Sequence, residues 1–135
     1  MQKMINAPKT LKPVSCGSLK EKALADCLLE DSLVLDFRSD AEQHAKSSGE
    51  AESCGLVVDG AYWPCRNIAD DPCADFAIDP KDYALAALCG TIQAIVHSHP
   101  KGGPASEIDK RACAGTGLPW HIWSVPDRQW LTIEP

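Results

Sequence analysis

The sequence lacks any apolar run long enough to cross a lipid bilayer. Its most apolar stretch, residues 84–96, is interrupted at Gly90 and Gln93 and falls short of the roughly 20 residues that a membrane-spanning helix needs. The first fifteen residues include lysines but no apolar h-region, so no secretion signal is recognisable. We therefore expect a cytoplasmic protein that has no membrane partner.

Positive charge is also scarce. The 135 residues include 13 Lys and Arg against 19 Asp and Glu, which gives a formal net charge of -6. An acidic chain without a stripe of Lys and Arg lacks the electrostatic footprint that binds a phosphate backbone. We therefore expect no nucleic-acid partner, and the same argument disfavours docking on anionic lipid.

Paired cysteine motifs are missing as well. The seven cysteines are an odd number and form no C-x-x-C pair, which argues against a disulfide framework or a zinc site made of cysteines alone. We expect reduced thiols packed as small apolar side chains. With 44% hydrophobic residues, a chain of this length is sufficient for one globular core.

The pattern of caps, turns and apolar runs predicts a flexible leader over residues 1–18, followed by one domain over residues 19–135. Residues 32–37 fit either a strand or a turn between helices. An Asp59-Gly60 pair predicts a tight hairpin. Helices and strands mixed in this way predict an α+β or three-layer α/β domain. The expected helices cover residues 19–29, 39–46, 79–89 and 106–114, and the expected strands cover residues 54–58, 61–63, 75–78, 92–97, 120–125 and 129–133.

The segment that carries chemistry begins at the end of the strand over residues 92–97. Alternate residues of a strand point to the same side, so His97 and His99 project two imidazoles together. A loop rich in Gly and Pro then lets the chain turn back, so that Asp109 on the next helix is able to meet them. Two His and one carboxylate leave a tetrahedral Zn²⁺ one open position for water, as in catalytic zinc sites.

Simpler interpretations of the same residues stay open at this point. Ser106 with Asp109 three residues later is also an ordinary helix start, and a His-x-His pair at a strand end can be merely polar. Glu52 is a candidate general base if its strand neighbours the His-x-His strand, but it also fits a solvated glutamate in an acidic stretch. The remaining histidines, His44 and His121, are expected to be structural.

Taken together, these segments resemble the JAMM (MPN+, Mov34/PAD-1) zinc-peptidase family over roughly residues 39–135. Within it, the chain is most similar to the amino-terminal domain of the lambda-type phage tail assembly protein K. The family motifs stand here as Glu52-x-Cys54-Gly55, His97-x-His99-Pro100 and Ser106-x-x-Asp109. The closer similarity rests on His44-Ala45, Pro64-Cys65-Arg66-Asn67, Phe76-x-Ile78 and the segment from Leu118-Pro119-Trp120 to Trp130.

The resemblance implies a curved mixed β-sheet flanked by helices, of the cytidine-deaminase-like JAMM/MPN type. It also implies Zn²⁺ held by His97, His99 and Asp109, with Glu52 as the acid and base. Ser106 would donate a hydrogen bond to the oxyanion that develops during peptide hydrolysis.

This sequence departs from the family pattern in two respects. Six residues separate His99 from Ser106, one fewer than the spacing expected for the family, and the Gly102-Gly103 pair is expected to absorb the difference. Lambda-type K proteins also usually continue into an NlpC/P60 cysteine-peptidase domain, which this sequence does not include. We therefore expect the domain to work alone or with an NlpC/P60 partner on another chain.

The resemblance leads to one principal functional expectation and two alternatives. The principal one is a zinc metallopeptidase that cleaves a peptide or isopeptide bond in a protein substrate, such as a tail protein, during phage or prophage tail assembly in a bacterial host cell. The first alternative is a JAMM protease that processes the C-terminus of a ubiquitin-like sulfur-carrier protein. The second is a non-catalytic MPN-type scaffold for tail assembly.

Overall fold

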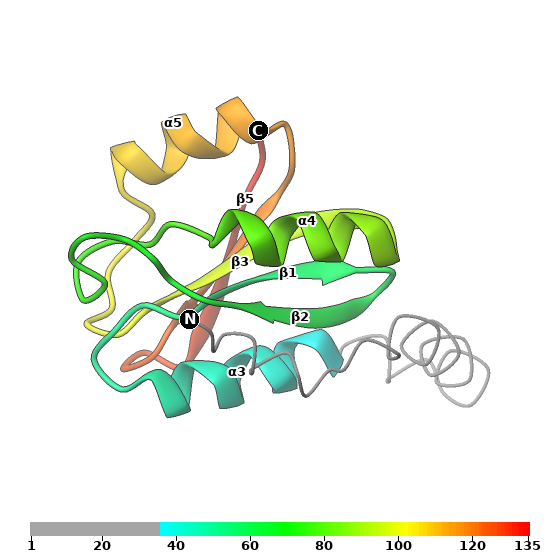
Figure 1. Ribbon diagram of the computed structural model, residues 1–135. Coiled ribbons are helices and arrows are strands. Elements are labelled where there is room, and N and C mark those ends of the chain that lie inside the picture. The colour runs from blue at the N-terminus through cyan, green and yellow to red at the C-terminus, as the bar shows by residue number, and fades with distance from the viewer. Residues whose placement is uncertain (1–35) are drawn as a thin grey trace.

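The structure is a computed structural model that describes residues 36–135 (Figure 1). The predicted leader and the predicted helix over residues 19–29 lie outside the described residues. The described helices are α3 (Asp36–Ser48), α4 (Pro80–Cys89) and α5 (Glu107–Thr116). The strands are β1 (Cys54–Val58), β2 (Ala61–Cys65), β3 (Ile92–His99), β4 (Trp120–Ser124) and β5 (Gln129–Ile133).

The five strands form one mixed sheet in the order β2-β1-β3-β4-β5. Neighbouring strands are antiparallel except for β3 and β4, which run parallel. A parallel pair needs a long crossover connection, and α5 lies within the one that leads from β3 to β4. The predicted mixed sheet flanked by helices is therefore confirmed.

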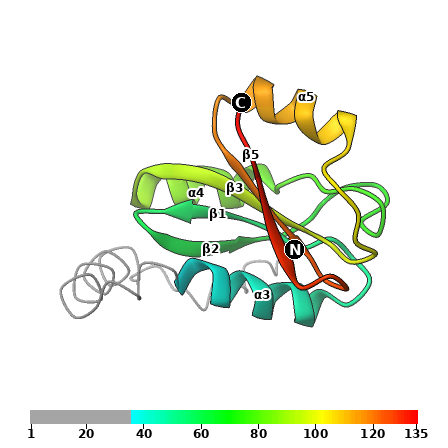
Figure 2. The same cartoon turned by 180° about the vertical axis from the view of Figure 1, so that it is seen from behind.

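Helices cover both faces of the sheet, so the domain has three layers (Figures 1 and 2). On one face, Phe37 and Ala41 of α3 pack against Val57, Tyr62 and other sheet residues. The opposite face carries the second core cluster, which includes one residue from α4 and one from α5 and consists of Cys54, Leu56, Val58, Trp63, Cys65, Ala86, Ile95, Cys113 and Trp120. Every residue of β1 is buried, as expected for a strand enclosed on both faces.

Most predicted elements are present, and the hairpin turn has positive φ at both Asp59 and Gly60, as its sequence indicated. Helix α4 begins where predicted, because Asp79 caps it with its side chain and Pro80 occupies the first turn. Strand β3 continues two residues further than predicted, to His99, because its pairing with β4 extends to that residue.

Two predictions about elements were wrong. Ser39 does not cap α3, which begins at Asp36, because Phe37 and Ala41, one helical turn apart, both pack on the sheet. Residues 75–78 form no strand, since their only ladder contact is an isolated bridge between Asn67 and Ile78.

The cysteines follow the prediction only in part. Cys54, Cys65 and Cys113 are buried free thiols and Cys73 is an exposed one, whereas Cys89 is disulfide-bonded. Among residues 36–135, no helix is both long and apolar enough to span a membrane.

Candidate metal centre

The carboxyl end of β3 presents two imidazoles on the same side of the sheet, as the alternation of strand residues predicts. The Nε2 atoms of His97 and His99 lie 3.2 Å apart. His97 is almost completely buried, whereas His99 lies at the edge of a cavity. His97 is therefore fixed in the core, whereas His99 faces the cavity.

Asp109 meets both imidazoles from the first turn of α5. Its Oδ1 lies 3.5 Å from Nε2 of His97, and its Oδ2 lies 3.2 Å from Nε2 of His99. The connecting loop turns back through Gly102 and Gly103, whose φ angles of +83° and +96° are readily adopted only by glycine. The prediction that these glycines accommodate the short loop agrees with their backbone angles.

The three side chains suit a tetrahedral divalent ion. Zn²⁺ binds imidazole nitrogen and carboxylate oxygen at about 2.0–2.2 Å, which places the ligand atoms about 3.3–3.5 Å apart. The two Nε2 atoms lie 3.2 Å apart, and their contacts of 3.5 and 3.2 Å with Asp109 are made to different oxygens of its carboxylate. With one ligand atom taken from each residue, the three atoms lie within 4.8 Å of one another. No other group of three or more His, Cys, Asp or Glu in the described part of the chain has this arrangement.

The charges of the three groups also suit a cation. Burial lowers the pKa of His97, so its imidazole is neutral at pH 7. Burial alone would raise the pKa of Asp109, but hydrogen bonds from His97 and His99 hold it well below its usual range. The hydrogen bond to Asp109 raises the pKa of His99. A carboxylate that favours its ionised form thus lies between two imidazoles, and binding of a metal ion there would release any proton held on the ligand atoms.

Aromatic packing fixes the ring of His97, which sequence reasoning did not anticipate. Phe76 stacks on the imidazole with ring centroids 4.2 Å apart, and Trp120 contacts it edge-on at 5.4 Å. Nδ1 of His97 is buried without a hydrogen-bond partner among the described residues, so stacking holds the ring in place. The only signal in the sequence was Phe76 itself. It lies within residues 75–78, a run whose pattern predicts a strand.

Glu52 lies next to these residues because of how β1 pairs with β3. Cys54 is opposite His97 in the antiparallel register, so Glu52, two residues earlier, lies level with His99 and on the same side. The pairing continues before β1, since the Ser98 N–H donates to the Ser53 carbonyl at 3.0 Å. The condition on which the sequence argument depended, that the two strands are neighbours, is met.

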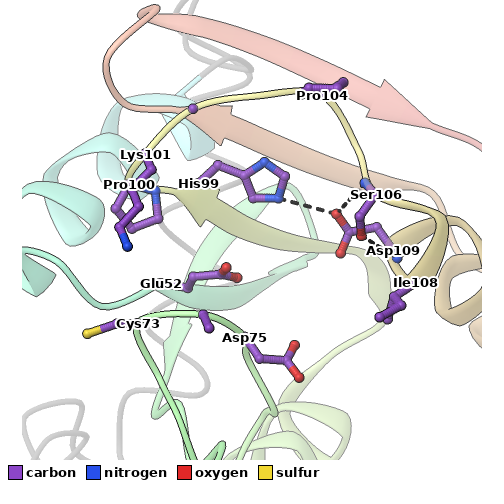
Figure 3. A pocket seen from close by; sticks show the side chains of 12 residues that line it. Glu52, Cys73, Asp75, His99, Pro100, Lys101, Pro104, Ser106, Ile108 and Asp109 are labelled. Carbon is purple, nitrogen blue, oxygen red and sulfur yellow. Dashed lines mark hydrogen bonds and ion pairs between the residues drawn. The ribbon is translucent and has the colours of Figure 1, made fainter.

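Glu52 also shares a cavity with two of the candidate ligands. Figure 3 shows its carboxylate pointing into the same cavity as His99 and Asp109. The cavity has a volume of about 410 Å³, and Ser106, Ile108 and Asp75 also line it. Burial raises the pKa of Glu52 to about 7, and the negative charges of Asp109 and Asp75 add to the effect while His99 opposes it. A carboxyl group with a pKa near 7 is suited to accept and return a proton.

Ser106 is the N-cap of α5, as the simpler interpretation of the sequence held. Its hydroxyl oxygen accepts a hydrogen bond from the Asp109 N–H at 2.9 Å. The hydroxyl group keeps its own hydrogen as a donor, and Ser106 lines the cavity.

The other two histidines are structural, as expected. Nδ1 of His44 lies 2.6 Å from the hydroxyl of Tyr62 on the face covered by α3. Nδ1 of His121 lies 3.0 Å from the hydroxyl of Thr132 on the neighbouring strand. Neither contributes to the cluster formed by His97, His99 and Asp109.

Two curated phage proteins are similar in sequence to this chain. The tail tip assembly protein K of Escherichia phage N15 is 44% identical over 97 residues, which cover 68% of this chain and 40% of that protein. The protein of the same name from Escherichia phage lambda is 44% identical over 46 residues, which cover 33% of this chain and 23% of that protein. The chain thus spans less than half the length of these curated relatives.

A solved structure supports the fold independently. The solution structure of protein DSY2949 from Desulfitobacterium hafniense matches with a TM-score of 0.60 at 23% identity, over 73% of this chain and 77% of that one. A family model described as prokaryotic homologs of the JAB domain matches residues 36–132. The chain therefore belongs to the prokaryotic JAB-domain family, which confirms the resemblance found in its sequence.

Proposed function

We propose that this chain is a zinc-dependent metallopeptidase that cleaves a peptide or isopeptide bond in a protein during phage or prophage tail assembly. The observation that carries the proposal is the convergence of His97, His99 and Asp109 beside a cavity that also contains the Glu52 carboxylate. The tail-assembly context rests on the printed names of the phage N15 and lambda relatives.

The two imidazoles and the carboxylate of Asp109 would hold the ion. Bound there, Zn²⁺ would supply Lewis acidity, which polarises a scissile carbonyl and makes water more acidic. The half-buried Glu52 would accept the proton of the attacking water as the C–O bond forms. It would then deliver that proton to the leaving amine nitrogen as the C–N bond breaks.

Ser106 would stabilise the negative charge that develops on the carbonyl oxygen. Its hydroxyl oxygen is already held by the Asp109 N–H at the start of α5, and its O–H hydrogen remains available to donate. A donor preorganised in this way stabilises an oxyanion without reorganisation during the reaction. Ser106 would thus act both as a helix cap and as a hydrogen-bond donor to substrate.

The proposal is tested by comparing the wild type with Glu52→Gln, and with Glu50→Gln as a matched control on an exposed neighbour. The substrates are tail proteins encoded beside this chain and a ubiquitin-like protein with a C-terminal extension. We expect about one zinc per chain in all three proteins and a loss of turnover of about 10²–10⁴-fold only in Glu52→Gln.

The substrate panel distinguishes the alternatives. Cleavage of a tail protein supports the proposal, and cleavage of the ubiquitin-like extension alone supports the sulfur-carrier alternative. A wild type that binds no zinc and cleaves nothing supports a scaffold. Equal turnover by Glu52→Gln and the wild type would show that Glu52 is not the base.

A further inference from the structure

One half-buried amide, that of Asn67, connects the segment that carries Glu52 with the wall of the cavity. Its Nδ2 donates to the backbone carbonyls of Glu52 at 2.9 Å and Asp75 at 3.0 Å, with a longer contact of 3.4 Å to that of Pro72. Its Oδ1 accepts from the backbone N–H groups of two alanines, Ala69 at 3.0 Å and Ala77 at 3.1 Å.

These contacts use the full capacity of the side chain, which has two N–H donors and two acceptor lone pairs. They also fix its orientation. In the flipped orientation, the oxygen would face three carbonyl oxygens and the NH₂ group would face two N–H donors. An aspartate at position 67 would keep the two hydrogen bonds that Asn67 accepts and would lose the hydrogen bonds that Asn67 donates. Asn67 therefore has a chemical role that its closest isostere cannot fill.

The loop that Asn67 ties together, residues 68–77, forms one side of the site. It supplies Cys73, Ala74 and Asp75 to the cavity wall and carries Phe76, which stacks on His97. The Glu52 N–H also donates to the Pro72 carbonyl at 2.8 Å. Both peptide groups of Glu52 are thus bonded to Asn67 or to the loop that Asn67 closes.

We propose that Asn67 is a positioning residue, which holds Glu52 at a fixed place beside the His97, His99 and Asp109 cluster. The inference rests on the proposed function for its catalytic meaning, since Glu52 must be the base for its position to affect turnover. Asn67 is neither a lining residue of the cavity nor a member of the cluster, and its hydrogen bonds reach the site through Glu52 and the loop.

The test uses Asn67→Asp in the full chain, because this change preserves the acceptor side of the network and removes the donor side. Asp71→Ala is the matched control. Its side chain accepts one bond within the same loop, from the Cys73 N–H at 3.2 Å, and reaches no part of Glu52. Hydrogen exchange of the Glu52 amide is measured by NMR in both variants and in the wild type.

We expect the Glu52 amide to exchange at least tenfold faster in Asn67→Asp, and to change by less than threefold in Asp71→Ala. With the substrate that the wild type cleaves, kcat should fall about tenfold to 100-fold in Asn67→Asp while KM stays within twofold. Zinc affinity should stay within threefold, because Asp keeps the two bonds accepted from the Ala69 and Ala77 N–H groups, which hold the part of the loop that carries Phe76. A merely structural role would weaken zinc binding and raise KM together with the loss of kcat.

Two results would overturn the proposal. One is an unchanged exchange rate at Glu52 in Asn67→Asp, and the other is faster exchange with an unchanged kcat. If the wild type cleaves no substrate, the proposed function fails, and the exchange rates alone decide whether Asn67 fixes Glu52.

A measurement on the wild type covers the case in which Asn67→Asp does not fold. The side-chain NH₂ protons of Asn67 should exchange at least tenfold more slowly than those of the exposed Gln43. Equal exchange rates would show that the amide is not held, and would overturn the proposal.

Discussion

Ser106 and Asp109 hold each other at the start of α5. The Asp109 N–H donates to the Ser106 hydroxyl at 2.9 Å, and the Ser106 N–H donates to Oδ2 of Asp109 at 3.0 Å. This reciprocal capping box begins the helix and at the same time orients the carboxylate toward His97 and His99. The two hydrogen bonds that begin the helix are therefore the same bonds that hold the Asp109 carboxylate in the candidate metal site.

Replacing Ser106 separates its two roles. Ser106→Ala removes the cap and should lower the free energy of unfolding by about 1 kcal/mol, whereas Ser106→Gly, a tolerated N-cap, should lower it by only a few tenths of a kcal/mol. Both variants lose the hydroxyl donor, so both should lose turnover, by about 10²-fold or more. Urea unfolding and cleavage kinetics provide the two measurements. Full activity in Ser106→Gly would rule out an oxyanion role.

Removing a candidate ligand should abolish metal binding. His99→Ala and Asp109→Asn each leave only two protein ligands, so zinc in the purified chain should fall from about one per molecule to less than one-tenth. Elemental analysis measures this directly. His121→Ala is the control, because His121 contacts Thr132 outside the cluster, and it should retain its zinc. Retention of zinc by both ligand variants would refute the assigned ligand set.

Chelation should destabilise the wild type and leave the ligand variants unaffected. A ligand present at about 1,000 times its Kd stabilises the folded state by about 4 kcal/mol. Adding EDTA should therefore lower the melting temperature of the wild type by about 10 °C or more, and that of His99→Ala should not move. Differential scanning calorimetry with and without EDTA makes the comparison. A wild type indifferent to EDTA would show that no stabilising metal is bound.

The raised pKa of Glu52 should make the stability of the zinc-free protein depend on pH. Burial raises this pKa from 4.5 to about 7, so the protonated form is favoured in the folded state. The stabilisation by that proton is fully present below about pH 4.5 and is lost as the pH rises through 7.

The difference between wild type and Glu52→Gln isolates this effect, because the glutamine side chain does not titrate. In EDTA, the free energy of unfolding of the wild type relative to Glu52→Gln should fall by about 1 kcal/mol between pH 4.5 and 8, since partial exposure screens the charge. Urea unfolding across this range measures the difference. A constant difference would mean that the pKa of Glu52 is ordinary.

Phe76 should support the metal site through its contact with His97. Phe76→Leu keeps an apolar side chain but loses the stacked ring at 4.2 Å, and should weaken zinc binding by about tenfold, as supporting residues of metal ligands do. Competition with a chromophoric zinc chelator measures the affinity. An unchanged affinity would show that Trp120 alone is enough to orient the ring.

The parts of this molecule that local chemistry specifies could be predicted well. The Asp59-Gly60 turn, the start of α4 at Asp79 and Pro80, and the pairing of His97 with His99 on one strand face each depend on a few consecutive residues. The prediction was less accurate where an element is defined by what it packs against. Helix α3 begins at Asp36 because Phe37 packs on the sheet, and no local cap indicates that start.

Local sequence patterns were enough to name the candidate ligands, because strand alternation puts His97 and His99 on one face and the capping box fixes Asp109 in the first turn of α5. The groups that surround these ligands depend on tertiary packing. The antiparallel register of β1 on β3 brings Glu52 level with His99, and the loop closed by Asn67 brings Phe76 onto His97. Those contacts join residues that are distant in the chain, and their geometry depends on how the sheet and loop pack rather than on the preferences of any short segment.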